Sequence, residues 1–264
     1  MIRVGVLGAA GRMGQLVCRA VADDPELVLV AAIDPAGNGE DVGRLVGHPE
    51  LDVRISQHHD TLLQAEPEVI VDFTGPDAVM DNVRWAIDHA INIVVGTTGL
   101  QPGDLEEIND RLESEGSESN VIVAPNFAIG AVLMQRFAAE AARHFPSVEI
   151  IELHHDGKAD APSGTALDTA MRLAKERDAY RGPDEESLPG TRGGDIEGIR
   201  IHSVRLPGLV AHQEVLFGGP GQTLTIRHDS MDRTSFMPGV LLAIKEIHGR
   251  PGLTVGLEPL LGLT

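Results

Sequence analysis

Residues 152–166 bring two adjacent histidines, a lysine and a predicted helix start into one short segment. Imidazole gains and loses a proton near neutral pH, whereas the amino group of Lys158 keeps its positive charge. Residues 148–153 are rich in β-branched residues and predict a strand that ends at His154 and His155. The two imidazoles then point to opposite faces, because side chains alternate along a strand. The pattern therefore predicts a proton donor and a fixed cation at one strand end.

A helix is predicted to begin directly after this lysine. Ala161-Pro162 interrupts the chain and Ser163 is a good N-cap residue. The apolar stripe of the helix is Ala166, Leu167, Ala170, Met171 and Ala174. The first N–H groups of a helix attract an anion, and Gly164 has no Cβ to keep an anion away. Gly164 and Thr165 are therefore predicted to form an anion site beside the histidines, although an ordinary strand end and an ordinary helix cap are the alternative.

A second ligand-binding pattern lies near the N-terminus. Residues 2–7 predict a buried strand, and an amphipathic helix pattern follows the glycine turn. The turn reads Gly8, Ala9, Ala10, Gly11, Arg12, Met13, Gly14. Strand, glycine turn and helix form a dinucleotide-binding unit, in which the turn and the helix start hold the pyrophosphate. The spacing is G-x-x-G-x-x-G rather than G-x-G-x-x-G, so the interpretation depends on the elements around it.

The second predicted strand supports a nucleotide site. Residues 27–33 are apolar nearly throughout, as in a strand covered on both faces, and end at Asp34. A carboxylate at this position, twenty residues after Gly14, can accept hydrogen bonds from both hydroxyls of the adenosine ribose of a dinucleotide. The alternative is a glycine turn that serves only helix–strand packing, and Asp34 favours the cofactor.

Three further strand patterns, at residues 69–74, 91–95 and 121–124, end in small or polar residues. The carboxyl ends of parallel strands share one edge of a doubly wound sheet, where the ligand crevice lies. The residues that we expect at the nicotinamide half of the cofactor are Thr74, Gly96, Thr97, Thr98, Ala124, Pro125, Asn126 and Phe127.

Composition narrows the class of protein. The 264 residues include 40 Asp and Glu against 21 Lys and Arg, a formal charge of -19 that repels nucleic acid and anionic membrane surfaces. The single cysteine, Cys18, excludes an internal disulfide framework. No signal peptide or apolar run of membrane length is recognised. We expect a soluble, cytoplasmic protein without nucleic-acid or membrane partners.

The pattern changes from about residue 130. A helix to residue 145 precedes the histidine strand and its helix. A polar loop at 181–198 and three strand patterns follow, at 199–206, 211–217 and 222–228. Such a sheet, with no helices between its later strands, can leave one face free for self-association.

The predicted fold class is therefore α/β with two domains. Residues 1–126, completed by 236–264, form a Rossmann-like doubly wound parallel sheet. This completion comprises a final helix from about residue 238 and an apolar tail, residues 253–263, that covers the first domain. Residues 127–235 form a substrate-binding α+β domain whose open sheet is used for oligomerisation.

Four motifs together resemble the 4-hydroxy-tetrahydrodipicolinate reductase (dihydrodipicolinate reductase) family of lysine and diaminopimelate biosynthesis. They are the glycine turn at 8–14, Gly-Thr-Thr-Gly at 96–99, Ala-Pro-Asn-Phe at 124–127, and residues 152–166. The resemblance covers essentially the whole chain, and His-His-x-x-Lys-x-Asp-Ala-Pro-Ser-Gly-Thr is its most specific part. It implies a homotetramer that reduces a cyclic dicarboxylate, 4-hydroxy-tetrahydrodipicolinate, to tetrahydrodipicolinate with NADH or NADPH and releases water.

The resemblance also implies residue roles. His154 is the proton donor, Lys158 is a second donor that contacts the substrate, and His155, Gly164 and Thr165 bind the substrate. The chain departs from the family in its second half: many members have Arg-Gly-Gly before Gly-x-His. Here Arg205-Leu206-Pro207-Gly208 precedes Val210-Ala211-His212.

The sequence is also compatible with other classes of protein. A two-domain NAD(P)-dependent dehydrogenase of the homoserine or semialdehyde type would share the first domain but does not need His-His-x-x-Lys. A cofactor-binding redox sensor usually carries a basic face, which this acidic chain lacks. A metal site would combine His154, His155 and Asp156 with His202 or His212, but no recognised ligand spacing is present, and we expect no metal. Arg233 is interpreted as a structural arginine.

Overall fold

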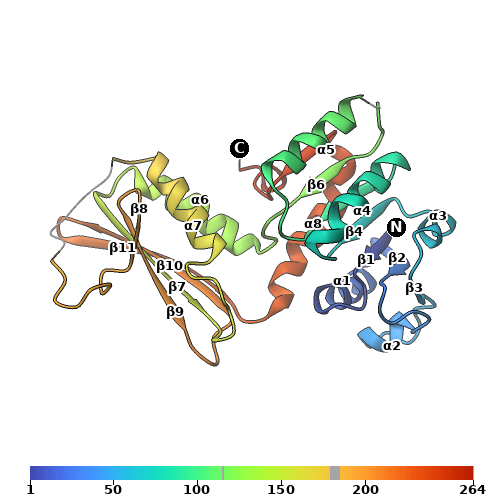
Figure 1. Cartoon of the computed structure of the whole chain (residues 1–264), viewed down its shortest axis with the longest axis horizontal. Coiled ribbons are helices and arrows are strands. Elements are labelled where there is room, and N and C mark those ends of the chain that lie inside the picture. Colours follow the sequence, from blue (N-terminus) through green and yellow to red (C-terminus); the bar gives the residue numbers. More distant parts are fainter. Residues whose placement is uncertain (115, 179–184, 264) are drawn as a thin grey trace. The chain divides into compact units, whose positions relative to one another are not determined.

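Residues 1–114, 116–178 and 185–263 are described in the computed structural model of the chain (Figure 1). They form two compact units. Unit 1 is Met1–Ala128 with Phe236–Thr264, and unit 2 is Ile129–Ser235. No helix of the described residues has both the length and the apolar character needed to span a bilayer.

Unit 1 contains a parallel sheet that has seven strands among the described residues. Its order is β12-β6-β5-β4-β1-β2-β3, so the chain runs from β1 first toward the β3 edge and later toward the opposite edge. The strands are β1 (Ile2–Leu7), β2 (Leu27–Ile33), β3 (Ile55–Ser56), β4 (Val69–Asp72), β5 (Asn92–Val95), β6 (Val121–Val123) and β12 (Leu253–Val255). This reversal beside β1 is the topological switch point at which open α/β sheets bind ligands.

Helices alternate with these strands along the chain. They are α1 (Arg12–Asp23), α2 (Val42–Val46), α3 (Asp60–Ala65), α4 (Pro76–Asp88), α5 (Pro102–Ser114) and α8 (Met237–Glu246). Two short 3-10 helices, Ile247–Gly249 and Pro259–Leu261, follow α8, and a third, Arg233–Phe236, precedes it. The apolar side chains of α4 that face the sheet are buried and pack with the strands in the core of unit 1; they are Val79, Val83, Ala86 and Ile87. The predicted Rossmann-like fold is confirmed.

Unit 2 is built on a mixed sheet of order β11-β10-β7-β9-β8. Its strands are β7 (Ser147–His154), β8 (Gly194–Ile196), β9 (Ile199–Arg205), β10 (Ala211–Gly219) and β11 (Gln222–Ser230). β7 and β9 are parallel, and every other neighbouring pair is antiparallel. This is the predicted α+β domain, with the histidine strand at the centre of the sheet.

Two helices, α6 (Ile129–Ala142) and α7 (Gly164–Lys175), lie along one face of this sheet (Figure 1). Side chains on that face, such as Ile150 of β7 and Phe217 of β10, form the core of unit 2 with both helices. The alternate residues of β7 are half-buried on the other face, which no helix of the described residues covers. The open sheet predicted from the sequence is therefore present.

Three expectations need correction. Met171, assigned to the buried stripe of α7, is 50% exposed, because the buried face is centred on Ala166, Ala170 and Leu173. The apolar tail does more than cover unit 1: β12 pairs with β6 and extends the parallel sheet by one strand. The polar loop contains β8, while residues 181–184 of that loop lie outside the described residues.

Candidate active site

The glycine turn has the geometry of a dinucleotide-binding motif. Gly8 directly follows β1 with φ +78°, a left-handed conformation that favours glycine. A Cβ on Gly14 would lie 2.0 Å from the carbonyl oxygen of Gly8, so only glycine lets α1 pack this close to the turn. Gly11 caps α1 without a side-chain hydrogen bond, which leaves the first N–H groups of the helix to a ligand.

Asp34 stands at the carboxyl end of β2 and is 8% exposed. Its Oδ1 accepts a hydrogen bond from the Ala36 N–H at 2.8 Å, and its Oδ2 accepts one from the Ala10 N–H at 2.9 Å. These bonds fix the carboxylate against the glycine turn. A carboxylate oxygen can accept more than one hydrogen bond, so both oxygens keep capacity for ribose hydroxyls. The residues present therefore fit a nicotinamide dinucleotide.

The other predicted cofactor residues follow the carboxyl ends of β4, β5 and β6, which are neighbours in the sheet. Sequence reasoning missed Asp72, the fully buried last residue of β4. Its Oδ1 accepts hydrogen bonds from the hydroxyls of Thr74 and Thr97, both at 2.7 Å, and its Oδ2 accepts one from Asn82 Nδ2 at 2.7 Å. Asp72 therefore links two of the loops that we assigned to the cofactor.

The loop after β6 is held by packing as well as by hydrogen bonds. The side chains of Ala124 and Phe127 are 2% and 3% exposed, and the Phe127 ring lies 5.8 Å from that of Phe73. Asn126 uses its side-chain oxygen to accept a hydrogen bond from the Ala128 N–H at 2.9 Å. These contacts shape the loop, in which Pro125 is the exposed residue.

In unit 2, the histidine strand ends as predicted. His154 is the last residue of β7 and its side chain is 15% exposed. Its Nδ1 lies 2.5 Å from Oε2 of Glu152, which is two residues earlier on the same face of the strand and fully buried. Burial lowers the pKa of His154 below its ordinary value, although the hydrogen bond with Glu152 opposes this shift.

Lys158 lies in the loop that follows. Its Nζ forms an ion pair with Asp160 Oδ1 at 2.8 Å, and its charge is one of those that lower the pKa of His154. Arg205, the last residue of β9, donates from Nη2 to the carbonyl oxygen of Asp160 at 2.6 Å. The same guanidinium binds both carboxylate oxygens of Glu152, at 2.8 and 2.9 Å. Arg205 therefore joins the lysine loop to the histidine strand.

The helix start is formed as the sequence predicts. Ser163 caps α7, and its Oγ accepts a hydrogen bond from the Ala166 N–H at 3.2 Å. Gly164 is exposed, and a Cβ built on it would meet nothing within 4 Å, so the space before the helix is open. Thr169, one turn into α7, accepts a hydrogen bond from Gln213, which is the cross-strand partner of Glu152. The first turns of α7 therefore pack over the part of the sheet that carries the histidine.

His202 and His212, the two distant histidines of the alternative metal site, have other partners. His212 uses both ring nitrogens: Nδ1 lies 2.6 Å from Asp229 Oδ1, and Nε2 accepts a hydrogen bond from the Val210 N–H at 3.1 Å. His202 pairs with Glu149 at 2.7 Å. Within the described parts of the chain, no group of three or more His, Cys, Asp or Glu side chains could hold a metal ion.

Two family models together match nearly the whole chain. Residues 2–127 match the dihydrodipicolinate reductase N-terminus family, and residues 130–261 match the C-terminus family. The chain belongs to the dihydrodipicolinate reductase family. The 4-hydroxy-tetrahydrodipicolinate reductases of Nocardia farcinica and Cutibacterium acnes are each 52% identical to it, over 99% and 100% of both chains.

Solved structures agree with the family assignment. A dipicolinate-bound dihydrodipicolinate reductase from Paenisporosarcina is 42% identical, covers 98% of this chain and 99% of its own, and superposes with a TM-score of 0.87. An amine dehydrogenase from Mycobacterium smegmatis, 17% identical with a TM-score of 0.66 over 96% of this chain and 94% of its own, shares the fold alone. The predicted NAD(P)H-dependent oxidoreductase of lysine and diaminopimelate biosynthesis is confirmed, and the homoserine or semialdehyde dehydrogenase alternative is not favoured.

Within this reductase, the predicted site residues fall into two groups. The residues predicted for the cofactor lie in unit 1, and those predicted for catalysis and substrate binding lie in unit 2. The side chain of His155 is exposed and forms no hydrogen bond with the described residues. Arg233 is exposed as well. The sequence analysis missed Glu152, Asp160 and Arg205. Glu152 could have been found, because a glutamate two residues before a histidine on a strand lies on the same face as that histidine.

Proposed function

We propose that this chain reduces 4-hydroxy-tetrahydrodipicolinate to tetrahydrodipicolinate with NADH or NADPH and releases water. The observation that carries the proposal is the arrangement at the end of β7. There a half-buried histidine is held by Glu152, and the Lys158 cation stands nearby. The Ser163 cap of α7 bonds to the Ala166 N–H and leaves those of Gly164 and Thr165 to a ligand. The reaction adds one hydride and one proton and loses one water. The histidine can supply the proton, while the lysine and the helix N–H groups can bind negative charge.

His154 supplies the proton in this proposal. Hydride addition to a conjugated carbon–nitrogen system leaves negative charge, which a nearby acid must neutralise. Lys158 stabilises that charge, because its ammonium group is positively charged. Its N–H groups also make it a second donor to the substrate. NADH or NADPH supplies the hydride when bound to the glycine turn, Asp34 and the loops after β4, β5 and β6.

The substrate carries two carboxylates, which need cations or N–H groups as partners. We assign Gly164 and Thr165 to one carboxylate, because the start of α7 offers backbone N–H groups to open space. His155 and Lys158 are assigned to polar groups at the periphery of the substrate. The dipicolinate held by the Paenisporosarcina reductase is likewise a cyclic dicarboxylate, which supports this class of substrate.

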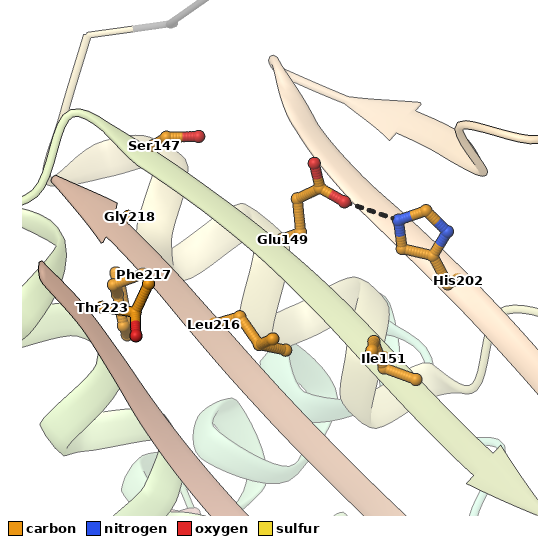
Figure 2. A pocket seen from close by; sticks show the side chains of 8 residues that line it. All are labelled: Ser147, Glu149, Ile151, His202, Leu216, Phe217, Gly218 and Thr223. Carbon is orange, nitrogen blue, oxygen red and sulfur yellow. Dashed lines mark hydrogen bonds and ion pairs between the residues drawn. The ribbon is translucent and has the colours of Figure 1, made fainter. Parts of the chain in front are cut away.

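We further propose that the enzyme is a cytoplasmic homotetramer formed through the open face of the unit 2 sheet. Ile151 of β7 and Leu216 of β10 lie side by side on this face, with the Glu149–His202 pair beside them (Figure 2). These residues line a shallow hollow with a volume of about 340 Å³. Apolar side chains on an uncovered sheet are stabilised by a second copy of the same face.

The function is tested by following NADH oxidation with purified enzyme and the product of the preceding synthase reaction. Homoserine with NAD⁺, and aspartate semialdehyde with NADP⁺ and phosphate, serve as comparison substrates for the two alternative dehydrogenases. The proposal predicts turnover of the cyclic dicarboxylate only. Turnover of either comparison substrate at a similar kcat/KM, with no oxidation of NADH by the dicarboxylate, would contradict it.

A further inference from the structure

We propose that Glu152 and Arg205 form a positioning pair that fixes the ring of His154 with Nε2 as the proton-donating atom. The inference rests on the proposed function, because it concerns the proton that His154 delivers. Neither residue needs to touch the substrate. Glu152 acts by holding the imidazole, and Arg205 acts by holding Glu152.

The geometry of the three side chains carries the proposal. Glu152 and His154 alternate with Leu153 along β7, so both lie on the face that carries the buried core. Glu152 Oε2 is 2.5 Å from His154 Nδ1, and the Glu152 carboxylate also receives two hydrogen bonds from Arg205. Arg205 stands next to His154 in the register of the parallel β7–β9 pair. One carboxylate therefore connects a guanidinium to an imidazole.

Glu152 is ionised in this arrangement. Desolvation by burial raises its pKa, but the hydrogen bonds from Arg205, Ser203 and His154 outweigh this effect and hold the pKa below the ordinary value. A fully buried carboxylate without such partners would instead be protonated. The bidentate guanidinium is thus the main reason that Glu152 can act as an acceptor for the imidazole.

An ionised Glu152 decides which ring nitrogen is reactive. A carboxylate only accepts hydrogen bonds, so Nδ1 of His154 must keep its proton to donate to Glu152. The proton that leaves the imidazolium then comes from Nε2, and Nε2 takes up the next proton from solvent. Within residues 1–114, 116–178 and 185–263, Nε2 has no hydrogen-bond partner.

The charges around His154 set the direction of the pH dependence. Glu152 favours the imidazolium, while Lys158 and Arg205 oppose it. On the neighbouring β10, Ala211 pairs with His154 and the neutral Gln213 pairs with Glu152. Asp160 carries the negative charge that pairs with Lys158. Removing the charge of Glu152 therefore lowers the pKa of His154 and leaves less imidazolium near neutral pH.

The test compares Glu152→Gln with the unaltered enzyme. Glutamine keeps the size of the side chain but removes its charge, so kcat should fall by about 10- to 100-fold while KM changes by less than about threefold. The alkaline limb of the kcat profile should move to lower pH, because His154 loses its proton earlier. Glu152→Asp keeps the charge at a shorter reach, and it should recover part of the lost kcat.

A direct readout of the ring separates positioning from a general loss of fold. The ¹⁵N shifts of histidine-labelled protein, assigned by comparison with His154→Gln, report the tautomer and the titration of His154. Glu152→Gln should lower the titration midpoint and weaken the preference for the Nδ1–H tautomer. Glu149→Gln removes a carboxylate from the opposite face of the same strand and should leave the His154 titration unchanged.

If Glu152→Gln does not fold, the double variant Glu152→Gln/Arg205→Met removes the pair and serves in its place. Its readout is the tautomer alone, because loss of Glu152 lowers the pKa of His154 whereas loss of Arg205 raises it. An unchanged midpoint and tautomer in folded Glu152→Gln, or an unchanged tautomer in the double variant, would overturn the inference, whatever the enzyme reduces. The expected shift of His154 in a protein that fails to reduce the dicarboxylate would support the positioning pair and reject the proposed function.

Discussion

Ala10 donates its backbone N–H to Oδ2 of Asp34 at 2.9 Å, so the glycine turn after β1 holds the carboxylate that follows β2. The N–H groups of Gly8 and Ala9 also join this turn to β2, since both donate to the carbonyl oxygen of Ile33. The bond from Ala10 fixes the carboxylate where the adenosine ribose of a dinucleotide lies in a Rossmann-type domain. The ribose site and the pyrophosphate site are therefore held in a defined relationship before cofactor binds.

The first prediction is that NADH is used at least as well as NADPH. A fixed carboxylate at Asp34 accepts hydrogen bonds from free ribose hydroxyls and repels the 2′-phosphate of NADPH, while the exposed Arg12 offers that phosphate only partial compensation. The check is kcat/KM for both cofactors. A value for NADPH more than about tenfold above that for NADH, a difference of roughly 1.4 kcal/mol, would contradict the role given to Asp34.

Gly164→Ala tests the anion site at the start of α7. The added methyl group enters the open space before the helix, where we place a substrate carboxylate, so KM for the dicarboxylate should rise. NADH affinity, measured by fluorescence titration, should hardly change. Equal losses of NADH and substrate binding would mean that this helix start serves the other ligand.

Gly14→Ala tests the packing of α1 against the glycine turn. Because the new Cβ would approach the Gly8 carbonyl oxygen to 2.0 Å, helix and turn must separate. Overpacking of this kind costs about 1–3 kcal/mol, so Tm and NADH affinity should both fall. Gly103→Ala in α5 is the matched control: its Cβ meets nothing within 4 Å, and Tm should stay or rise. Equal Tm values for the two variants would reject the close packing.

Leu216→Arg tests the open face of the unit 2 sheet. An arginine there puts a charge among the apolar side chains of the proposed interface, so light scattering should show smaller assemblies than the tetramer. Met171→Arg, at an exposed position of α7, is the control and should keep the mass of the unaltered protein. A tetramer that persists in Leu216→Arg would place the interface elsewhere.

The elements that position the site were predictable because their signals are local. Ser163 caps α7 and β7 ends at His154, as hydrogen-bonding side chains and a β-branched run indicate. Short elements gave no such signal. β12 has three residues, too few for a period, and it was interpreted as a tail although it extends the sheet.

Partners that are distant in the sequence could not be predicted in the same way. Arg205 reaches Glu152 because β7 and β9 run parallel in one register, which no local pattern reveals. Asp72 was interpreted as one residue of a strand pattern, and its hydrogen bond with Thr97 depends on how β4 and β5 pair. Met171 was misplaced because the exact rotation of α7 is set by its packing on the sheet.

The most direct test of the account is the steady-state reduction of 4-hydroxy-tetrahydrodipicolinate by variants of the histidine strand, with folding checked by Tm. His154→Gln removes the proposed acid and should lower kcat by about 10²- to 10⁴-fold. His155→Ala should act chiefly on KM, and Lys158→Ala should damage both constants, since its charge meets the substrate before and during reduction. A near-normal kcat for folded His154→Gln, with activity abolished in His155→Ala, would contradict the assignment of the proton donor.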